Sequence, residues 1–301
     1  MCSDITYSFY ILNCFYILSV KVTHQKLSYL GIMETSLRQL ALNHLAISSP
    51  TEKVLAVFQL FDDFMVSPKL DVSEIFSISS LEIPGKPIKP DLVPPLAVKR
   101  RAMHTIEGRA IAIHALAHIE FNAINLALDA IWRFSDMPRT YYRDWLTVAK
   151  EEAYHFSLLN NHLHSLGYEY GDFPAHNSLW EMVEKTKDDV LARMALVPRT
   201  MEARGLDAVP VVKDRFIQVK DIEMVKILEI ILADEIGHVE IGNRWFNYLC
   251  DLRALNPIDV FQQLCLQYKA PTLKGPFNIP ARLLAGFTET ELKVLQNQAI
   301  S

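Results

Sequence analysis

The sequence predicts an all-α protein built on four long helices, with an N-terminal helical extension and a C-terminal helical segment. Two observations support this fold class. No stretch alternates apolar and polar residues for long enough to form a sheet. From about residue 97, apolar residues instead recur at steps of three and four, as on the buried face of a packed helix. Half of the 301 residues are hydrophobic, which is enough for a sizeable core without disulfides or a structural metal.

Start and stop signals place the individual helices. Residues 34–47 have helical periodicity. Ser49-Pro50-Thr51-Glu52 then combines an N-cap serine, a proline at the first helical position and an acid at the third, which predicts a helix to about Asp63. Residues 82–95 hold five prolines and a glycine, which predicts an extended linker. Four long helices, separated by proline or glycine, are expected at 99–134, 139–166, 178–204 and 212–251.

The chain is expected to divide into four segments. The last 45 residues indicate a short helix, a Pro/Gly-rich loop and a final helix opening at Thr288. In chain order the segments are 1–32, an extension outside the fold; 33–96, N-terminal helices and linker; 97–252, the four-helix bundle; and 253–301, a segment packing on the bundle.

Residues 1–32 differ in composition from the rest, and Met33 opens a stretch typical of the start of a soluble protein. The alternative is a membrane anchor, since residues 5–20 are apolar, although a spanning helix needs ~20 residues.

Charge and cysteine content narrow the function classes. The net charge of −5 gives no electrostatic footprint for nucleic acid or an anionic membrane, so neither is an expected partner. The four cysteines form no CxxC pair and no zinc spacing with histidine. Reduced, unreactive thiols in a cytoplasmic protein are the expectation.

One apolar helical stretch, ADEIGHVEIG at 233–242, carries two chemically demanding residues. Glu235 and His238 continue an apolar stripe with steps of three and four, so they occupy core positions. The second long helix repeats the pattern with Glu152 and His155. The chain therefore has a buried Glu-x-x-His motif twice.

Each motif is preceded by a further core-facing acid on another helix. These acids are Glu120 on the first long helix and Glu202 on the third. Glu152 follows Glu120 by 32 residues, and Glu235 follows Glu202 by 33. This regularity indicates an internal repeat of two helical hairpins.

Four buried carboxylates and two imidazoles require compensating charge, because an isolated buried carboxylate is costly. Two divalent metals would balance the carboxylates and leave the imidazoles neutral as ligands. Di-iron and di-manganese carboxylate bundles use this arrangement, and ligands without thiolate favour Fe, the preferred metal, or Mn. The metal ligands are thus predicted as Glu120, Glu152, His155, Glu202, Glu235 and His238. The alternative is a metal-free bundle with hydrogen-bonded Glu–His and Glu–Arg pairs.

Three further residues are candidates for supporting roles. Glu151 lies four residues before His155 and Asp234 four before His238, so each could accept the second imidazole N–H on its own helix. The alternative for both is a solvated helix face. His162, two turns from His155, is a candidate cavity-lining group. His114 and His118 are expected to be structural, because His118 lies about 200° around the helix from Glu120.

The motifs together resemble a known family. The segments that carry the resemblance are HALAHIEFNAINLALDAIWRF, DWLTVAKEEAYHF, HLHSLGYEYGDFPAHNSLWE, EARGLD and ILADEIGHVEIGNRWF. They are similar, over about residues 33–290, to a ferritin-like family described only as a domain of unknown function. The resemblance implies a ferritin-like four-helix bundle with the six predicted ligands at its metal positions. A more distant similarity is to the non-haem di-iron hydroxylase that modifies a tRNA base.

Three functions are consistent with these features. The first is a di-metal oxidoreductase in which O₂ or a peroxide oxidises an organic small molecule. The others are iron handling or storage, and a non-catalytic scaffold with a vestigial site. A tRNA-base hydroxylase is a subclass of the first, against which the negative charge weighs. No nucleotide-binding fingerprint is present, so an electron-donor protein or the substrate must supply electrons, and a homo-oligomer is a further expectation.

Overall fold

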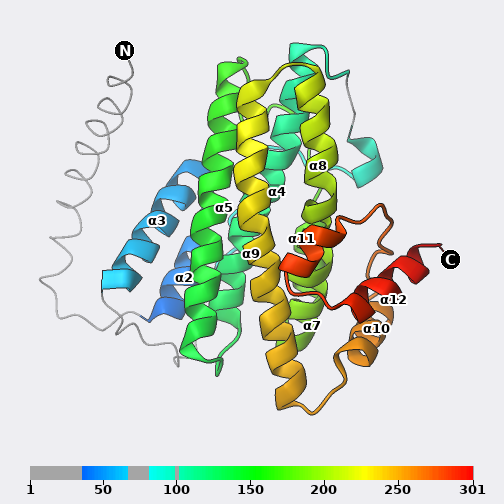
Figure 1. The fold of residues 1–301 in the computed structure, drawn as a ribbon. Coiled ribbons are helices and arrows are strands. Elements are labelled where there is room, and N and C mark those ends of the chain that lie inside the picture. The colour runs from blue at the N-terminus through cyan, green and yellow to red at the C-terminus, as the bar shows by residue number, and fades with distance from the viewer. Residues whose placement is uncertain (1–35, 67–80, 99–101, 301) are drawn as a thin grey trace, which may run out of the picture.

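The computed structural model describes residues 36–66, 81–98 and 102–300. Within these ranges the chain is helical, with no β-strand and one isolated bridge between Leu92 and Ala175. Four long helical columns stand side by side (Figure 1). They are formed by α4 (Ile106–Arg133), α5 (Arg139–Ser165), the succession α7 (Val190–Leu196), η2 (Val197–Glu202) and α8 (Ala203–Gln218), and α9 (Ile222–Leu252). The all-α prediction is confirmed; residues 1–32 lie outside the described residues.

Shorter helices flank the columns on two sides. Two N-terminal helices, α2 (Leu37–Leu45) and α3 (Pro50–Val66), pack against α4 and α5 respectively. A strap at 81–98, containing the short η1 (Pro95–Ala97), leads into α4. Beyond α9 the chain forms three C-terminal helices, of which α10 packs on α7, and α11 on α8 and α9. These helices are α10 (Pro257–Gln267), α11 (Ile279–Leu284) and α12 (Glu289–Ile300).

Side-chain caps fix where the long helices begin. The Thr105 hydroxyl accepts a hydrogen bond from the Gly108 amide at 3.0 Å, which caps the start of α4. Asp221 caps α9 in the same way by accepting from the Met224 amide at 3.2 Å. At the other end of α5, Gly167 adopts a left-handed φ of +83°, a conformation that suits glycine and stops the helix. The starts of α4 and α9 and the end of α5 therefore follow from local capping chemistry.

The third and fourth columns differ from their predicted limits. The chain turns after α6 (Ser178–Lys185), and the helix beginning at Val190 then runs through residues 205–210, where a break was expected. Pro210 is tolerated because the Leu206 carbonyl, left without its helical N–H donor, accepts from the Asn278 side chain at 3.1 Å. The break comes at residues 219–221 instead, so α9 begins at Ile222 and not at 212.

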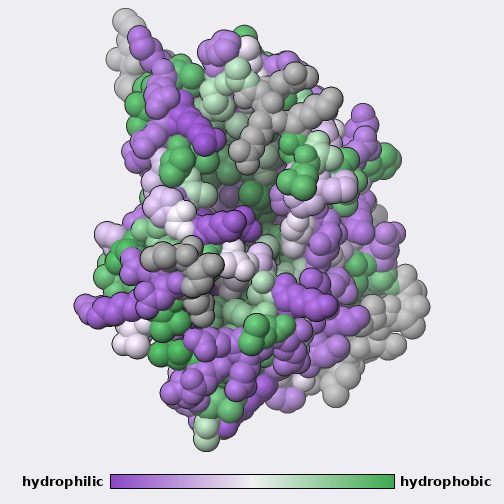
Figure 2. All heavy atoms as spheres, turned by 90° about the vertical axis from the view of Figure 1, so that its right-hand side faces the viewer, coloured by the Kyte–Doolittle hydropathy of each residue, from purple (hydrophilic) through white to green (hydrophobic). Residues whose placement is uncertain are grey.

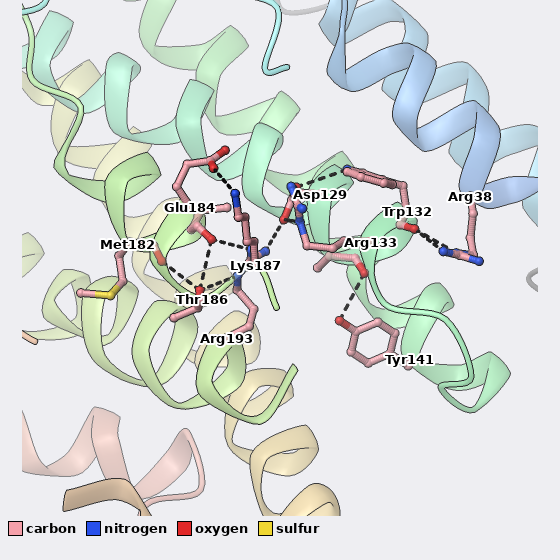
Figure 3. Close-up of polar contacts among 12 residues, drawn as sticks. Arg38, Asp129, Trp132, Arg133, Tyr141, Met182, Glu184, Thr186, Lys187 and Arg193 are labelled. Atoms are coloured by element: carbon pink, nitrogen blue, oxygen red, sulfur yellow. Dashed lines mark hydrogen bonds and ion pairs between the residues drawn. The ribbon is translucent and has the colours of Figure 1, made fainter. Parts of the chain in front are cut away.

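A buried charge network ties α4 to α6 and α7. Asp129 is inaccessible to solvent, pairs with Arg193, and accepts from Arg133 at 2.9 Å and from the Trp132 indole at 3.2 Å (Figure 3). Arg193 also donates to the Thr186 hydroxyl at 2.9 Å. Two arginines outweigh the burial that would raise the pKa of Asp129, and they hold it below its usual range. The network joins the first and third columns near one end of the bundle.

Two buried basic side chains anchor the N-terminal helices. Arg38 donates to the Trp132 carbonyl at 2.7 Å, at the end of α4. Lys53 on α3 is inaccessible to solvent, contacts the Asn125 side chain and donates to the Leu45 carbonyl at 3.1 Å. Burial lowers the pKa of Lys53 from 10.5 to about 7. An amine so placed is largely neutral above that pH.

This lowered pKa predicts a specific pH dependence. Between pH 7 and 10.5 the unfolded chain keeps the Lys53 proton while the folded chain releases it, so this residue's contribution makes stability rise with pH by about 1.4 kcal/mol per unit. Lys53→Met removes the contribution. The free energy of unfolding of the variant, measured in urea at pH 7, 8 and 9, should therefore fall steadily relative to the unchanged protein. A pH-independent difference between the two would contradict the buried neutral amine.

One described helix, α4, is long and apolar enough to cross a membrane by length and composition. Its most apolar 18-residue window has a mean hydropathy of 1.4, but 72% of that window is buried inside the protein. Asp129, Glu120 and Asn125 on the same helix are also buried. These features are consistent with the core helix of a soluble protein.

Candidate metal centre

The six predicted ligands come from all four columns and lie inside the bundle. Their exposed fractions run from 0% for Glu152 and His155 to 9% for Glu202. By position, Glu120 lies on α4, Glu152 and His155 on α5, Glu202 at the end of η2, and Glu235 and His238 on α9. Glutamates are rarely buried this deeply unless they are paired or bind a cation.

Five of the six side chains form two triads that share one residue. The first is Glu120, Glu152 and His155; the second is Glu152, Glu235 and His238. In each triad the candidate ligand atoms lie within 4.8 Å of one another. The two oxygens of Glu152 face different histidines: Oε2 is 3.5 Å from His155 Nδ1, and Oε1 is 2.9 Å from His238 Nδ1. Glu152 is therefore common to both triads and turns one oxygen toward each histidine.

Glu202 belongs to neither triad. It is buried beside them, and its carboxyl interacts electrostatically with Glu152 and His238. One turn later, Gly205 faces Glu235: a Cβ added at Gly205 would lie 3.9 Å from the Glu235 carboxylate. The sixth predicted ligand is thus next to the site, but it does not complete a cluster.

The outer nitrogens of the two imidazoles show a pairing that differs from the same-helix prediction. His155 Nε2 lies 2.9 Å from Asp234 on α9, and His238 Nε2 lies 2.8 Å from Glu151 on α5. Both carboxylates contact an imidazole, but each does so across the α5–α9 interface. The reason is that α5 and α9 pack face to face, which brings each acid closer to the opposite histidine. This reciprocal exchange couples the two Glu-x-x-His motifs.

These contacts fix which ring nitrogens are free. An imidazole that donates from Nε2 to a carboxylate presents, when neutral, an unprotonated Nδ1. Both Nδ1 atoms face carboxylate oxygens, His155 Nδ1 lying 3.3 Å from Glu120 Oε2, without hydrogen-bond geometry. Burial opposes protonation of both rings, but the surrounding carboxylates outweigh it and raise the pKa of His155 and His238 above its usual value, so without a metal a proton lies between each Nδ1 and the facing oxygen.

Unpartnered buried atoms provide the test of whether the residues fit a metal. Seven buried atoms of the six residues have no hydrogen-bond partner. They are Glu120 Oε2, both oxygens of Glu152, His155 Nδ1, Glu202 Oε2, Glu235 Oε2 and His238 Nδ1. Buried polar atoms normally have partners, and leaving one unsatisfied costs about 1–3 kcal/mol. Oxygen and imidazole donors without thiolate fit hard or intermediate divalent cations.

The electrostatics of the cluster also indicate missing positive charge. Burial, with the neighbouring Glu152 charge, raises the pKa of Glu120 and of Glu202 to about 8. The same two causes raise the pKa of Glu235 well above its usual range. Burial also opposes ionisation of Glu152, but the His238 charge outweighs it and holds the pKa of Glu152 below its usual value. The raised pKa values of Glu120, Glu202 and Glu235 oppose simultaneous ionisation of the four carboxylates, which bound cations would favour.

A π-helical segment, which the sequence analysis did not predict as such, positions Glu202. The segment η2 contains Pro198, whose ring contacts Gly242 of α9 so closely that a Cβ there would lie 2.5 Å from the Pro198 Cβ. Proline inside a helix was the available signal, because it removes a backbone donor. Gly242 allows α9 to approach η2 closely, one turn after His238.

Three other histidines have structural partners. His162, the candidate cavity-lining group, lies outside the two triads, and its Nε2 is 3.0 Å from Asp221, the residue that caps α9. His114 accepts from the Gly171 amide at 2.9 Å, and His118 contacts the Tyr170 hydroxyl at 2.8 Å. Burial lowers the pKa of both His114 and His118 to about 4. These two hold the loop after α5 against α4, as expected for structural histidines.

Comparison with known proteins assigns the chain to a family. A family model described as "Protein of unknown function (DUF455)" matches residues 46–293. The chain belongs to this family. An uncharacterized protein from Haemophilus influenzae is 48% identical over 257 residues, which cover 82% of this chain and 89% of that protein. No solved structure matches the chain.

The carboxylates that contact the outer imidazole nitrogens give a prediction for this DUF455 member. Asp234→Asn keeps the shape of the side chain but removes the charge that orients His155. We expect metal affinity to fall about 10–100-fold, the usual cost of losing such a partner. Competition with a metal-binding dye measures the affinity. Glu240→Gln, on the exposed side of α9, is the control, and equal affinities in both variants would contradict the orienting role.

Proposed function

We propose that the chain is a ferritin-like four-helix-bundle protein that holds two Fe or Mn ions and oxidises a small organic substrate with O₂ or a peroxide. The observation that carries the proposal is the set of seven unpartnered buried atoms on Glu120, Glu152, His155, Glu202, Glu235 and His238. Clusters that can hold a metal account for five of these residues, and the sixth is adjacent.

The distribution of the ligands among the four helical columns supports the ferritin-like interpretation. Such bundles take one glutamate from each of two helices and Glu-x-x-His from each of the other two. Here α4 and η2 supply the single glutamates, while α5 and α9 supply the motifs. Glu152, shared by both triads, is assigned as the bridging carboxylate.

Bound in this centre, the metal pair would supply the redox chemistry and the activation of O₂ or peroxide. The chain's own residues contribute orientation and exclusion of water. Asp234 and Glu151 hold the imidazoles with Nδ1 turned inward. Glu152, the carboxylate that both triads share, and His155 are fully buried, so the packed helices keep solvent away from them. Because no nucleotide-binding fingerprint is present, the proposal includes an electron-donor protein or a reducing substrate.

The compartment and assembly are part of the same proposal. Among the described residues, Cys250 and Cys265 are free thiols. Burial raises the pKa of each to about 11, so neither is readily ionised. Unreactive free thiols and ready access to Fe(II) favour the cytoplasm. A homo-oligomer of a few chains is compatible with this role, whereas an iron-storage protein would form a large shell.

Oxygen uptake tests the proposal. The full chain is loaded anaerobically with Fe(II) and mixed with O₂, and uptake is followed with an electrode. We expect faster uptake than by free Fe(II) in buffer, loss of this acceleration in Glu152→Gln, and its retention in Glu240→Gln. Uptake no faster than buffer would refute the oxidase role. Oxygen uptake that continues when far more than two iron ions per chain are supplied, together with particles of dozens of chains on a sizing column, would indicate storage.

A further inference from the structure

A cavity separate from the metal centre lies where the C-terminal helices cover the bundle. Residues from η2, α10, α11 and α12 line it, together with the loops that join the last three helices. It contains about 460 Å³ of empty space, part of which is open to solvent. Figure 2 shows the face of the molecule seen from the right-hand side of Figure 1, where α10–α12 lie; polar side chains cover most of this face, with apolar ones between them.

Two buried arginines line the cavity, and each has an unused donor. Arg199 is 2% exposed, pairs with Glu291 and donates to Asn243 at 2.6 Å, but its Nε has no partner. Arg282 is fully buried and donates to Asp207 at 2.6 Å, but its Nη1 has no partner. Buried donors are normally satisfied, so two unpartnered N–H groups on the lining of one cavity indicate an absent acceptor.

Both guanidinium groups pack on one aromatic ring. The Phe287 ring centroid lies 4.7 Å from Arg199 Cζ and 5.2 Å from Arg282 Cζ. Phe261 also contacts Arg199, at 5.0 Å. The remaining lining is largely apolar, and includes Leu273 and Leu295. The cavity thus combines two buried donors with an apolar wall, a combination that suits a ligand with an acceptor group and a hydrocarbon body.

Burial disfavours the charge of Arg199, and a further anion beside it would offset that cost. Burial lowers the pKa of Arg199 even though Glu291 beside it acts in the opposite direction. The guanidinium charge is therefore incompletely compensated by its own partner. A carboxylate, with two oxygens and a single charge, matches the planar donor arrangement of arginine.

We propose that this cavity binds a small organic monocarboxylate, whose oxygens accept from Arg199 Nε and Arg282 Nη1 and whose hydrocarbon part packs on Phe261, Phe287 and Leu295. The site shares no residue with the candidate metal centre. Arg199 nevertheless lies one turn before Glu202, and Arg282 donates to the Ala203 carbonyl at 3.2 Å. A ligand in the cavity therefore contacts η2, the segment that carries Glu202.

Isothermal titration calorimetry of the full chain with 3-phenylpropionate and hexanoate tests this site. Each acid is compared with the alcohol of the same carbon skeleton, which lacks the charged acceptor. We expect one carboxylate per chain and at least about 10-fold weaker binding of the alcohols, the difference typical of a charged hydrogen bond. No measurable binding of either acid, or equal binding of acid and alcohol, would overturn the proposal.

Two tryptophan substitutions on α10 locate the site. Gln262 lines the cavity, so Gln262→Trp should fill it and weaken binding at least about 10-fold. Leu266, which is 81% exposed on the same helix, provides the matched control, and Leu266→Trp should bind as the unchanged protein does. Circular dichroism establishes that both variants fold, and Val294→Trp replaces Gln262→Trp if that variant does not. Equal affinities in the cavity and control variants would overturn the location.

A third variant separates this site from the metal centre. Binding of 3-phenylpropionate should persist in Glu152→Gln, because the cavity does not depend on metal. Loss of binding in that variant alone would mean that the carboxylate coordinates the metals, and it would refute the cavity site while leaving the proposed oxidase function intact.

Discussion

Glu152→Gln is expected to abolish metal binding, whereas Glu120→Gln and Glu235→Gln should each leave about one ion per chain. Glu152 belongs to both triads, and its two oxygens face His155 and His238. The other two glutamates each belong to one triad only. Glutamine keeps the size of the side chain but lacks the charge and the second oxygen ligand. Elemental analysis of Fe- or Mn-loaded protein, normalised to chain concentration, measures the outcome.

A graded result is what distinguishes a shared carboxylate from a general folding effect. Glu240→Gln, an exposed position on α9, should retain the full metal content. If Glu152→Gln held as much metal as Glu120→Gln, the bridging assignment would be wrong. If all three variants held as much metal as the unchanged protein, the centre itself would be refuted.

Removal of metal should cost several kcal/mol of stability, and Glu235→Gln should remove much of that difference. A ligand that binds only the folded state at about 1,000 times its Kd adds about 4 kcal/mol per site. In the metal-free protein burial, with the charge of Glu152, raises the pKa of Glu235 well above its usual range, which favours the neutral form of the side chain. Glutamine mimics that neutral form and should change the stability of the chelated protein by less than about 1 kcal/mol.

The pH dependence of the metal-free protein has a definite sign. Burial, with the charge of Glu152, raises the pKa of Glu120 and Glu202 to about 8. Above the ordinary value of 4.5 the unfolded chain has released these protons while the folded chain retains them. Stability of the chelated protein should therefore fall as pH rises from 5 to 8. Metal binding requires deprotonated ligands, so the stabilisation by metal should grow over the same range.

Urea unfolding of the unchanged protein and of Glu235→Gln, each with Mn(II) and with EDTA at pH 5, 7 and 8, provides the measurement. A wild-type protein that is as stable with EDTA as with Mn(II) would contradict the role of metal. A Glu235→Gln variant that is strongly destabilised in EDTA would show instead that Glu235 serves a structural hydrogen-bonding role.

The residues of the candidate centre could be predicted from the sequence because helical periodicity is a local property. Glu152, His155, Glu235 and His238 continue apolar stripes, and such stripes face a core wherever the helices pack. The near-equal spacings to Glu120 and Glu202 added the long-range information. The structure buries all six side chains and brings five of them together in two triads.

What the sequence could not provide depends on contacts between distant segments. Asp234 and Glu151 each contact the histidine of the facing helix, a choice made by α5–α9 packing and not by spacing within one helix. The third column continues through Pro210 because Asn278, 68 residues later, satisfies the Leu206 carbonyl. The cavity beside Arg199 likewise exists only because the C-terminal helices fold back on η2.

Anomalous diffraction from crystals of the Mn- or Fe-loaded chain, recorded on both sides of the metal absorption edge, tests the central claim most directly. The account predicts two anomalous peaks inside the bundle, one bounded by Glu120, Glu152 and His155 and one by Glu152, Glu235 and His238. Peaks only at the protein surface, or none between α4, α5 and α9 in a well-ordered loaded crystal, would contradict it.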